Sequence, residues 1–156
     1  MQLITSPQPL NQVQHPAVFL AGTIEDGRSI DWQSLLIDEL TAFEITILNP
    51  RRAAWDVSWQ QSIDQPEFRQ QVEWELAALE RADWIFLYFV AGSHSPISLL
   101  ELGLHAHSGK VIIVCPEGFW KKGNVDIVAQ RFDLPIFTSL DSGINDLKNK
   151  IVHALG

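Results

Sequence analysis

The sequence predicts a single doubly wound α/β domain, flavodoxin-like or Rossmann-like, with a five-stranded and mainly parallel sheet. Short apolar runs bounded by Gly, Pro and polar residues recur along the chain, as expected of buried strands. Segments with apolar residues at helical spacing separate these runs, so that strands and helices alternate. The connections are long enough to hold crossover helices, which parallel pairing requires.

The composition suits a globular chain whose partner is a small molecule or a protein surface. Its 156 residues fit one domain over 1–156, with 11 Lys and Arg against 19 Asp and Glu and a net charge of −8. Nucleic-acid binding depends largely on cationic side chains, so this balance argues against a nucleic-acid partner. No apolar run approaches the roughly 20 residues that span a bilayer, and no signal segment follows Met1. We therefore expect a cytoplasmic protein with no membrane partner.

The first part of the chain predicts a β-α-β unit behind an irregular lead-in. Residues 1–16 show little periodicity and are expected to form no regular element. The apolar run over 17–22 ends in Gly22, which predicts a buried strand and a glycine-bounded loop. Apolar residues at helical spacing over 30–43 predict a helix. The run over 43–48 predicts the next strand, which an Asn-Pro pair ends.

A long polar and aromatic segment, 51–65, has no clear period. It is either a binding loop or a surface excursion held by Trp55 and Trp59. A helix is then expected to begin at Pro66 and to end near Arg81. The remaining predicted strands are 84–90, 111–115 and 134–137. Three more helices are predicted: the first begins at Ser95, the second is short and ends near Arg131, and the third spans 140–155.

In a doubly wound sheet the ligand binds beyond the carboxyl ends of the strands. The predicted elements place four connecting segments at that edge of the sheet. We expect the site to be formed by residues 22–28, 49–65, 92–98 and 117–124.

Two carboxylates lie on helix faces that are expected to point inward. On the helix that Ser95 should cap, Glu101 lies within about 40° of Ile97 on an apolar stripe. On the preceding helix, Glu75 lies about 20° from Phe68, in the middle of the inward face. The alternative for either Glu is a solvated surface position. A buried carboxylate needs partners or a raised pKa, which is a common condition of catalytic acids.

A pair of inward carboxylates is the arrangement that glycosidic chemistry requires. One attacks or stabilises the sugar carbon, and the other manages the proton of the leaving group. The sequence holds no GxGxxG, P-loop, GxSxG or CxxC motif that would indicate another chemistry. His105 and His107 point about 200° apart on a helix and cannot share a metal ion, and the lone Cys115 lies in an apolar run. We therefore expect no metal and no cofactor.

Four segments of the chain match a known sequence pattern: Phe19 to Gly22, Trp74 to Asp83, Ser95 to Gly103 and Gly109 to Val111. Over roughly 17–128 they resemble the nucleoside 2-deoxyribosyltransferase family and the related 2′-deoxynucleoside 5′-phosphate N-hydrolases. The resemblance implies that Glu101 is the nucleophile, which attacks C1′ of the deoxyribose and forms a covalent glycosyl-enzyme. It implies that Glu75 handles protonation of the leaving base. It also implies a homo-oligomer in which Asn124 lies near a neighbouring subunit's site.

The chain departs from the family pattern at three positions. Phe19 stands where the family has a tyrosine that orients the nucleophile, and Tyr88 is the candidate to supply the missing hydroxyl. Ser95 stands where the family has a second aspartate, and Glu75 replaces a shorter Asp. Trp55, in the long loop, is the aromatic residue that we assign to substrate binding.

Three functions are open at this point. The first is transfer of deoxyribose between the bases of 2′-deoxynucleosides. The second is N-hydrolysis of 2′-deoxynucleoside 5′-monophosphates, because Ser95 and the segment from Gly22 and Thr23 to Arg28 resemble the phosphate side of that site. An acidic pair inside this segment would repel a phosphate. The third is a nucleoside-binding or nucleotide-binding module without turnover, which the missing hydroxyl and carboxylate favour.

Overall fold

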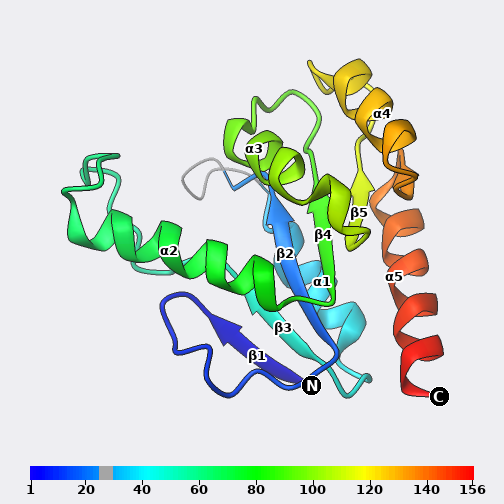
Figure 1. Ribbon diagram of the computed structural model, residues 1–156, viewed down its shortest axis with the longest axis horizontal. Helices are drawn as coiled ribbons and strands as arrows, with labels where there is room; N and C mark the ends of the chain where they lie inside the picture. Colours follow the sequence, from blue (N-terminus) through cyan, green and yellow to red (C-terminus); the bar gives the residue numbers. More distant parts are fainter. Residues whose placement is uncertain (25–29) are drawn as a thin grey trace.

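The computed structural model describes residues 1–24 and 30–156, and these residues form a six-stranded parallel sheet with helices on both faces (Figure 1). The order of the strands across the sheet is β1-β3-β2-β4-β5-β6. The strands are β1 (Gln2–Thr5), β2 (Ala17–Gly22), β3 (Thr46–Asn49), β4 (Trp84–Tyr88), β5 (Val111–Val114) and β6 (Ile136–Phe137). The helices are α1 (Trp32–Leu40), α2 (Pro66–Arg81), α3 (Pro96–His105), α4 (Lys122–Arg131) and α5 (Leu140–Leu155).

β1 was not predicted from the sequence, so the expected five-stranded sheet is corrected to six strands. Part of the expected irregular lead-in over 1–16 pairs in parallel with β3, with Gln2 opposite Thr46. The strand has four residues and Ile4 is its one buried position, so it carries no detectable period. β1 pairs with the edge of β3, and nothing in the sequence of residues 1–16 indicates this pairing.

Without β1, the order β3-β2-β4-β5-β6 is the flavodoxin-like order, as the sequence predicts. The order of the strands reverses at β2, because β3 lies on one side of it and β4 on the other. The connection after β2 leads to α1 on one face, and the connection after β4 leads to α3 on the other face. A crevice opens where these two connections diverge.

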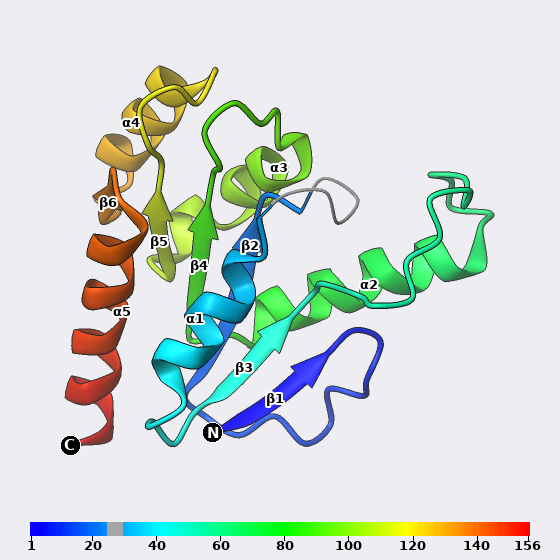
Figure 2. The ribbon, with the colours of Figure 1, turned by 180° about the vertical axis from the view of Figure 1, so that it is seen from behind.

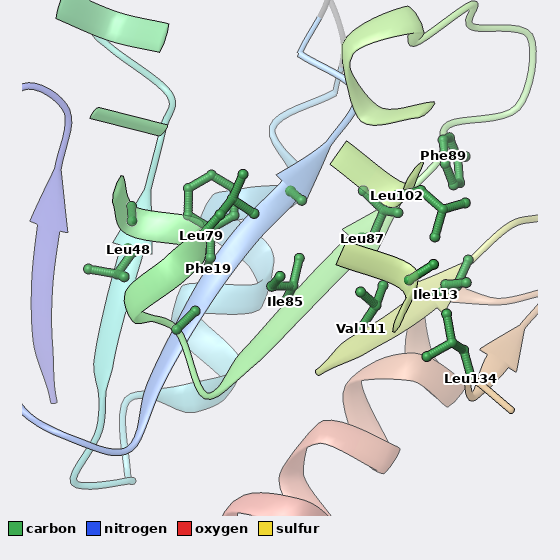
Figure 3. Close-up of a cluster of buried hydrophobic side chains, with 14 of the residues drawn as sticks. Phe19, Leu48, Leu79, Ile85, Leu87, Phe89, Leu102, Val111, Ile113 and Leu134 are labelled. Atoms are coloured by element: carbon green, nitrogen blue, oxygen red, sulfur yellow. The ribbon is translucent and has the colours of Figure 1, made fainter. Parts of the chain in front are cut away.

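The helices form two layers around the sheet. α2, α3 and α4 cover one face, and α1 and α5 cover the other, as the opposite views in Figures 1 and 2 show. Side chains of β2 alternate between the two layers. Phe19 belongs to the cluster under α2 and α3 (Figure 3), whereas Val18 and Leu20 pack with α1 and α5.

The predicted ends of the helices agree better with the structure than the predicted ends of the strands. The helices predicted over 66–81 and 140–155 are confirmed at both ends. The strand predicted to continue to Val90 ends at Tyr88, because the N–H group of Val90 donates to the Thr23 hydroxyl at 2.9 Å instead of to a neighbouring strand. The last predicted strand is reduced to two residues, β6.

Asp83 holds the amino-terminal edge of the sheet, opposite the crevice. Its carboxylate accepts a hydrogen bond from the N–H of Ala17 at 2.7 Å and lies 2.7 Å from Nδ1 of His15. The Asp83 N–H in turn donates to the Ala17 carbonyl at 2.8 Å. This residue of the family-like segment therefore joins the starts of β2 and β4 and has a structural position.

α5 lies so close to the sheet at Gly143 that an added Cβ would be 2.3 Å from Cγ2 of Val114. We expect Gly143→Ala to lower the free energy of unfolding by about 1–3 kcal/mol, because the helix would have to move away from the sheet. Gly123→Ala in α4 is the matched control, since a Cβ there meets no neighbouring atom within 4 Å. Denaturant unfolding measures both variants. Unchanged stability of Gly143→Ala would contradict this packing.

Candidate active site

A cavity of about 890 Å³ opens at the carboxyl edge of the sheet, where the strand order reverses. Residues from the ends of β1, β2 and β3, from the segments that follow them, and from α2 and α3 line it. The volume is within the range of small-molecule sites. The predicted site residues among the lining are Gly22, Thr23, Trp55, Glu75, Ser95 and Glu101.

The structure brings the two predicted carboxylates together, because Glu75 of α2 and Glu101 of α3 line the same cavity. Burial raises the pKa of Glu101 to about 8, and the charge of Glu75 contributes to this rise. Burial also raises the pKa of Glu75, while a hydrogen bond from Gln71 opposes that rise. Both carboxyl groups therefore resist ionisation.

Glu75 and Glu101 titrate as a coupled pair. Once one carboxyl group is charged, ionisation of the other is unfavourable, so the pair holds one proton near neutral pH. The pair thus supplies one carboxylate and one proton donor. Nucleophilic attack on a sugar carbon and protonation of a leaving group need this combination.

The two carboxyl groups have unequal surroundings. Nε2 of Gln71 donates a hydrogen bond to Oε1 of Glu75 at 2.9 Å. Glu101 accepts no hydrogen bond and makes no ion pair with any residue in the described part of the chain. The charge of the pair is therefore favoured on Glu75, and the proton on Glu101.

Three hydroxyl groups join the start of α3 to the end of β2. Oγ1 of Thr23 lies 2.5 Å from Oγ of Ser95 and 3.1 Å from Oγ of Ser93. Ser95 is buried and has a φ of 46°, a left-handed conformation that is unfavourable for a residue with a Cβ. Ser95 is the N-cap residue of α3, as predicted, but its hydroxyl makes no capping hydrogen bond to the helix. The hydroxyl contacts instead fix where α3 begins and help to place Glu101.

Backbone contacts fix the end of β2 in the same region. An added Cβ on Gly22, which has a φ of 139°, would lie 2.3 Å from the carbonyl oxygen of Tyr88. Only Gly allows this approach between β2 and β4. The indole N–H of Trp32 donates to the Thr23 carbonyl at 2.9 Å. Gly22 and Thr23 therefore shape the wall of the cavity.

Tyr88 is not among the described residues that line the cavity. Its ring packs edge-on against Trp32, with centroids 5.6 Å apart, on the face that α1 covers. Phe19 lies on the opposite face, under α2. The expectation that the Tyr88 hydroxyl replaces the one missing at Phe19 is therefore wrong, because the two side chains point to different faces of the sheet.

The remaining predicted residues have different positions. Trp55 lines the cavity and packs edge-on against Trp59, with ring centroids 5.3 Å apart. Arg28 lies outside the described residues. Asn124 is exposed on α4, away from the described lining of the cavity in its own chain. Its place near a neighbouring subunit's site stays a prediction.

The cavity also includes residues that the sequence analysis did not select. Gln71 lies one helical turn before Glu75, and this i, i+4 spacing could have indicated the contact. Arg51 and Arg52 follow β3 and line the same cavity, but no pattern in the sequence distinguishes them. A guanidinium N–H of Arg51 donates to Oε1 of Gln33 at 3.2 Å.

Other reactive groups do not form a second centre. Among the residues described, no three His, Cys, Asp or Glu side chains are grouped as metal ligands. Cys115 is buried in the core, and burial raises the pKa of its thiol to about 11, so it is not an active nucleophile near neutral pH. No helix in the described ranges is long and apolar enough to cross a membrane.

The raised pKa of Glu101 predicts a pH-dependent stability. Since the folded state keeps a proton that the unfolded chain releases between pH 4.5 and about 8, wild-type stability should fall as pH rises through this window. Glu101→Gln removes this loss. We expect it to stabilise the protein at pH 8 relative to pH 5 by on the order of 1 kcal/mol or more.

Thermal unfolding at both pH values measures the effect. Glu73→Gln is the control, because Glu73 is exposed on the same helix as Glu75. Identical pH dependence for wild type and Glu101→Gln would show that Glu101 is not held in its neutral form.

A crystal structure of a conserved protein from Enterococcus faecalis V583 is similar to this chain, with a TM-score of 0.61. The sequence identity is 11%, and the likeness covers 86% of this chain and 98% of that chain, so it shows the fold alone. No curated protein matches the sequence. The family described as "Nucleoside 2-deoxyribosyltransferase like" matches residues 15–119, which is more than half of the chain and includes Glu75 and Glu101. The chain therefore belongs to the nucleoside 2-deoxyribosyltransferase-like family.

Proposed function

We propose that this protein cleaves the N-glycosidic bond of 2′-deoxynucleosides and transfers the deoxyribose to another base. The observation that carries the proposal is the carboxyl pair, Glu75 and Glu101, which faces one cavity and holds one proton. The family supports a nucleoside as the substrate. The cavity is large enough for a ligand of that size.

Glu101 is the proposed nucleophile. A carboxylate oxygen forms a bond to C1′ of the sugar while the bond from C1′ to the base nitrogen breaks, and the electron pair of that bond goes to the base. Glu75 delivers the proton of the pair to the leaving base. An incoming base then attacks C1′, the bond to Glu101 breaks, and the proton of the incoming base returns to Glu75.

The attack requires Glu101 to be charged, although its burial favours the proton on this residue. Positive charge develops on C1′ as the glycosidic bond breaks. A positive charge next to Glu101 lowers the pKa of its carboxyl group, so the proton moves to Glu75 as the transition state forms. The single proton of the pair is therefore enough for the reaction.

A 2′-deoxynucleoside 5′-monophosphate N-hydrolase is the second candidate, because Arg51 and Arg52 line the same cavity as Glu75 and Glu101. Guanidinium groups bind phosphate oxygens well. The Ser95 hydroxyl gives this candidate less support, since it contacts Thr23 and Ser93. A binding module without turnover is the third candidate.

The experiment that separates the three is incubation with 2′-deoxynucleosides or their 5′-monophosphates, with and without a second free base. Chromatography follows the bases. Exchange of one base for another supports the transferase, and release of base from the monophosphates alone supports the hydrolase. Ligand-dependent thermal stabilisation without any released base would support the binding module and overturn the proposal.

Replacement of the nucleophile tests the assigned chemistry. We expect Glu101→Gln to lower kcat by more than about 10³-fold, because no covalent intermediate can form. Glu73→Gln on α2 should keep the wild-type rate, since its side chain is exposed and pairs with Arg69. The same chromatographic assay measures both variants. Full activity of Glu101→Gln would exclude it as the nucleophile.

The coupled pair predicts a bell-shaped dependence of kcat/KM on pH. At low pH both carboxyl groups are protonated and no nucleophile is present, while above about pH 8 both are charged and the proton for the base is lost. In Glu75→Gln the high-pH limb should disappear, because the proton donor is lost, and the reduced rate should only rise with pH as Glu101 ionises. That rise should lie below pH 8, because the charge of Glu75 no longer raises the pKa of Glu101. Initial rates between pH 4 and 10 test this. A high-pH limb that persists in Glu75→Gln would show that Glu75 does not carry the proton for the base.

A further inference from the structure

Gln71 is a buried side chain with all of its donor hydrogens in use. It is 4% exposed and lies on α2, one turn before Glu75. Its Nε2 donates to Oε1 of Glu75 at 2.9 Å and to the carbonyl oxygen of Pro50 at 2.9 Å. Its Oε1 accepts from the hydroxyl of Ser6 at 2.6 Å. Because both amide hydrogens have partners within the protein, this group is not available to hold a substrate.

The partners of Gln71 also fix the direction of its amide. The Pro50 carbonyl can only accept, so it must face the NH₂ group of Gln71. An amide turned by 180° would place two acceptor oxygens together and lose the bond to Glu75. The donor is therefore always directed at the carboxyl group.

Ser6 connects this arrangement to the strand that the sequence did not predict. It directly follows β1, is 4% exposed, and its N–H continues the pairing with β3 by donating to the Asn49 carbonyl at 3.1 Å. The next segment is fastened to α2 as well, since the indole N–H of Trp74 donates to the Gln8 carbonyl at 2.7 Å. The ends of β1 and β3 thus meet α2 at Gln71.

We propose that Gln71 is the positioning residue of the carboxyl pair, and that β1 acts on the site by holding Gln71 in place through Ser6. The inference rests on the proposed function, in which Glu75 carries the proton for the base. Gln71 keeps one oxygen of Glu75 engaged at the cavity wall. The other oxygen is left for the proton transfer.

The hydrogen bond also acts on the protonation of Glu75. A donor directed at a carboxylate favours the charged form, and here it opposes the effect of burial. Loss of the donor should raise the pKa of Glu75. The low-pH limb of the rate profile then moves to higher pH.

Gln71→Met tests the proposal, because Met fills a similar volume without hydrogen bonds. We expect kcat to fall at least about tenfold with a smaller change in KM, since the acid is misplaced while the substrate contacts remain. The low-pH limb of kcat/KM should move upward. Gln130→Met, the same exchange at an exposed position on α4, is the control and should leave both quantities unchanged.

Ser6→Ala is the second variant, in case Gln71→Met does not fold. It removes the bond to Oε1 of Gln71 and keeps both donors of that side chain. We expect a smaller fall in kcat and a smaller upward shift of the low-pH limb of kcat/KM than in Gln71→Met. A folded Gln71→Met protein with wild-type kcat and low-pH limb would overturn the proposal, and wild-type values in Ser6→Ala would overturn the part assigned to β1.

A direct titration separates this inference from the proposed function. Carbon-13 NMR of labelled Glu carboxyl groups, with Glu75→Gln to assign the resonance, follows Glu75 in wild type and in Gln71→Met. A higher midpoint in Gln71→Met supports the positioning role even if no base is exchanged, whereas an equal midpoint contradicts it. Absence of base exchange in the wild type would count against the proposed function alone.

Discussion

Two carboxyl groups in one cavity cannot both be charged without a large repulsion, and the arrangement around Glu75 and Glu101 follows from this constraint. α2 and α3 cover the same face of the sheet, so their inward stripes meet at its carboxyl edge. One group has a fixed donor and the other has none in the described chain. This inequality sets where the charge rests, and in the proposed reaction the positive charge that develops on the sugar reverses it. The site is therefore adaptable in protonation although its geometry is fixed.

The fixed geometry comes mainly from backbone approach and buried hydroxyl groups. β2 can end against β4 only because Gly22 has no side chain. Thr23 then contacts Ser93 and Ser95, which compensates for the left-handed conformation of Ser95. Phe19, at the position where the resemblance predicts a tyrosine, is buried in the core with Trp74. The position of Glu101 consequently depends on where α3 begins.

The sequence predicts the features that have a strong local period. The two long helices, the flavodoxin-like order and the inward faces of both carboxylates follow from apolar spacing, and the structure agrees with them. β1 has no such period, and it forms because β3 has a free edge. The face of Tyr88 was not predictable either, since β4 is apolar on both sides. The contact of Ser6 with Gln71 joins residues 65 positions apart, which no local pattern can indicate.

The addition of β1 also changes what the sheet offers to other chains. An edge strand carries unpaired N–H and C=O groups, on which a strand from another molecule can assemble. Here one edge is β1, with four residues, and the other is β6, with two. The strands β3, β2, β4 and β5 lie between them and have both sides paired. The sheet therefore offers only short edges to which a strand of another molecule could add. The apolar strands in the middle of the sheet are protected from such pairing.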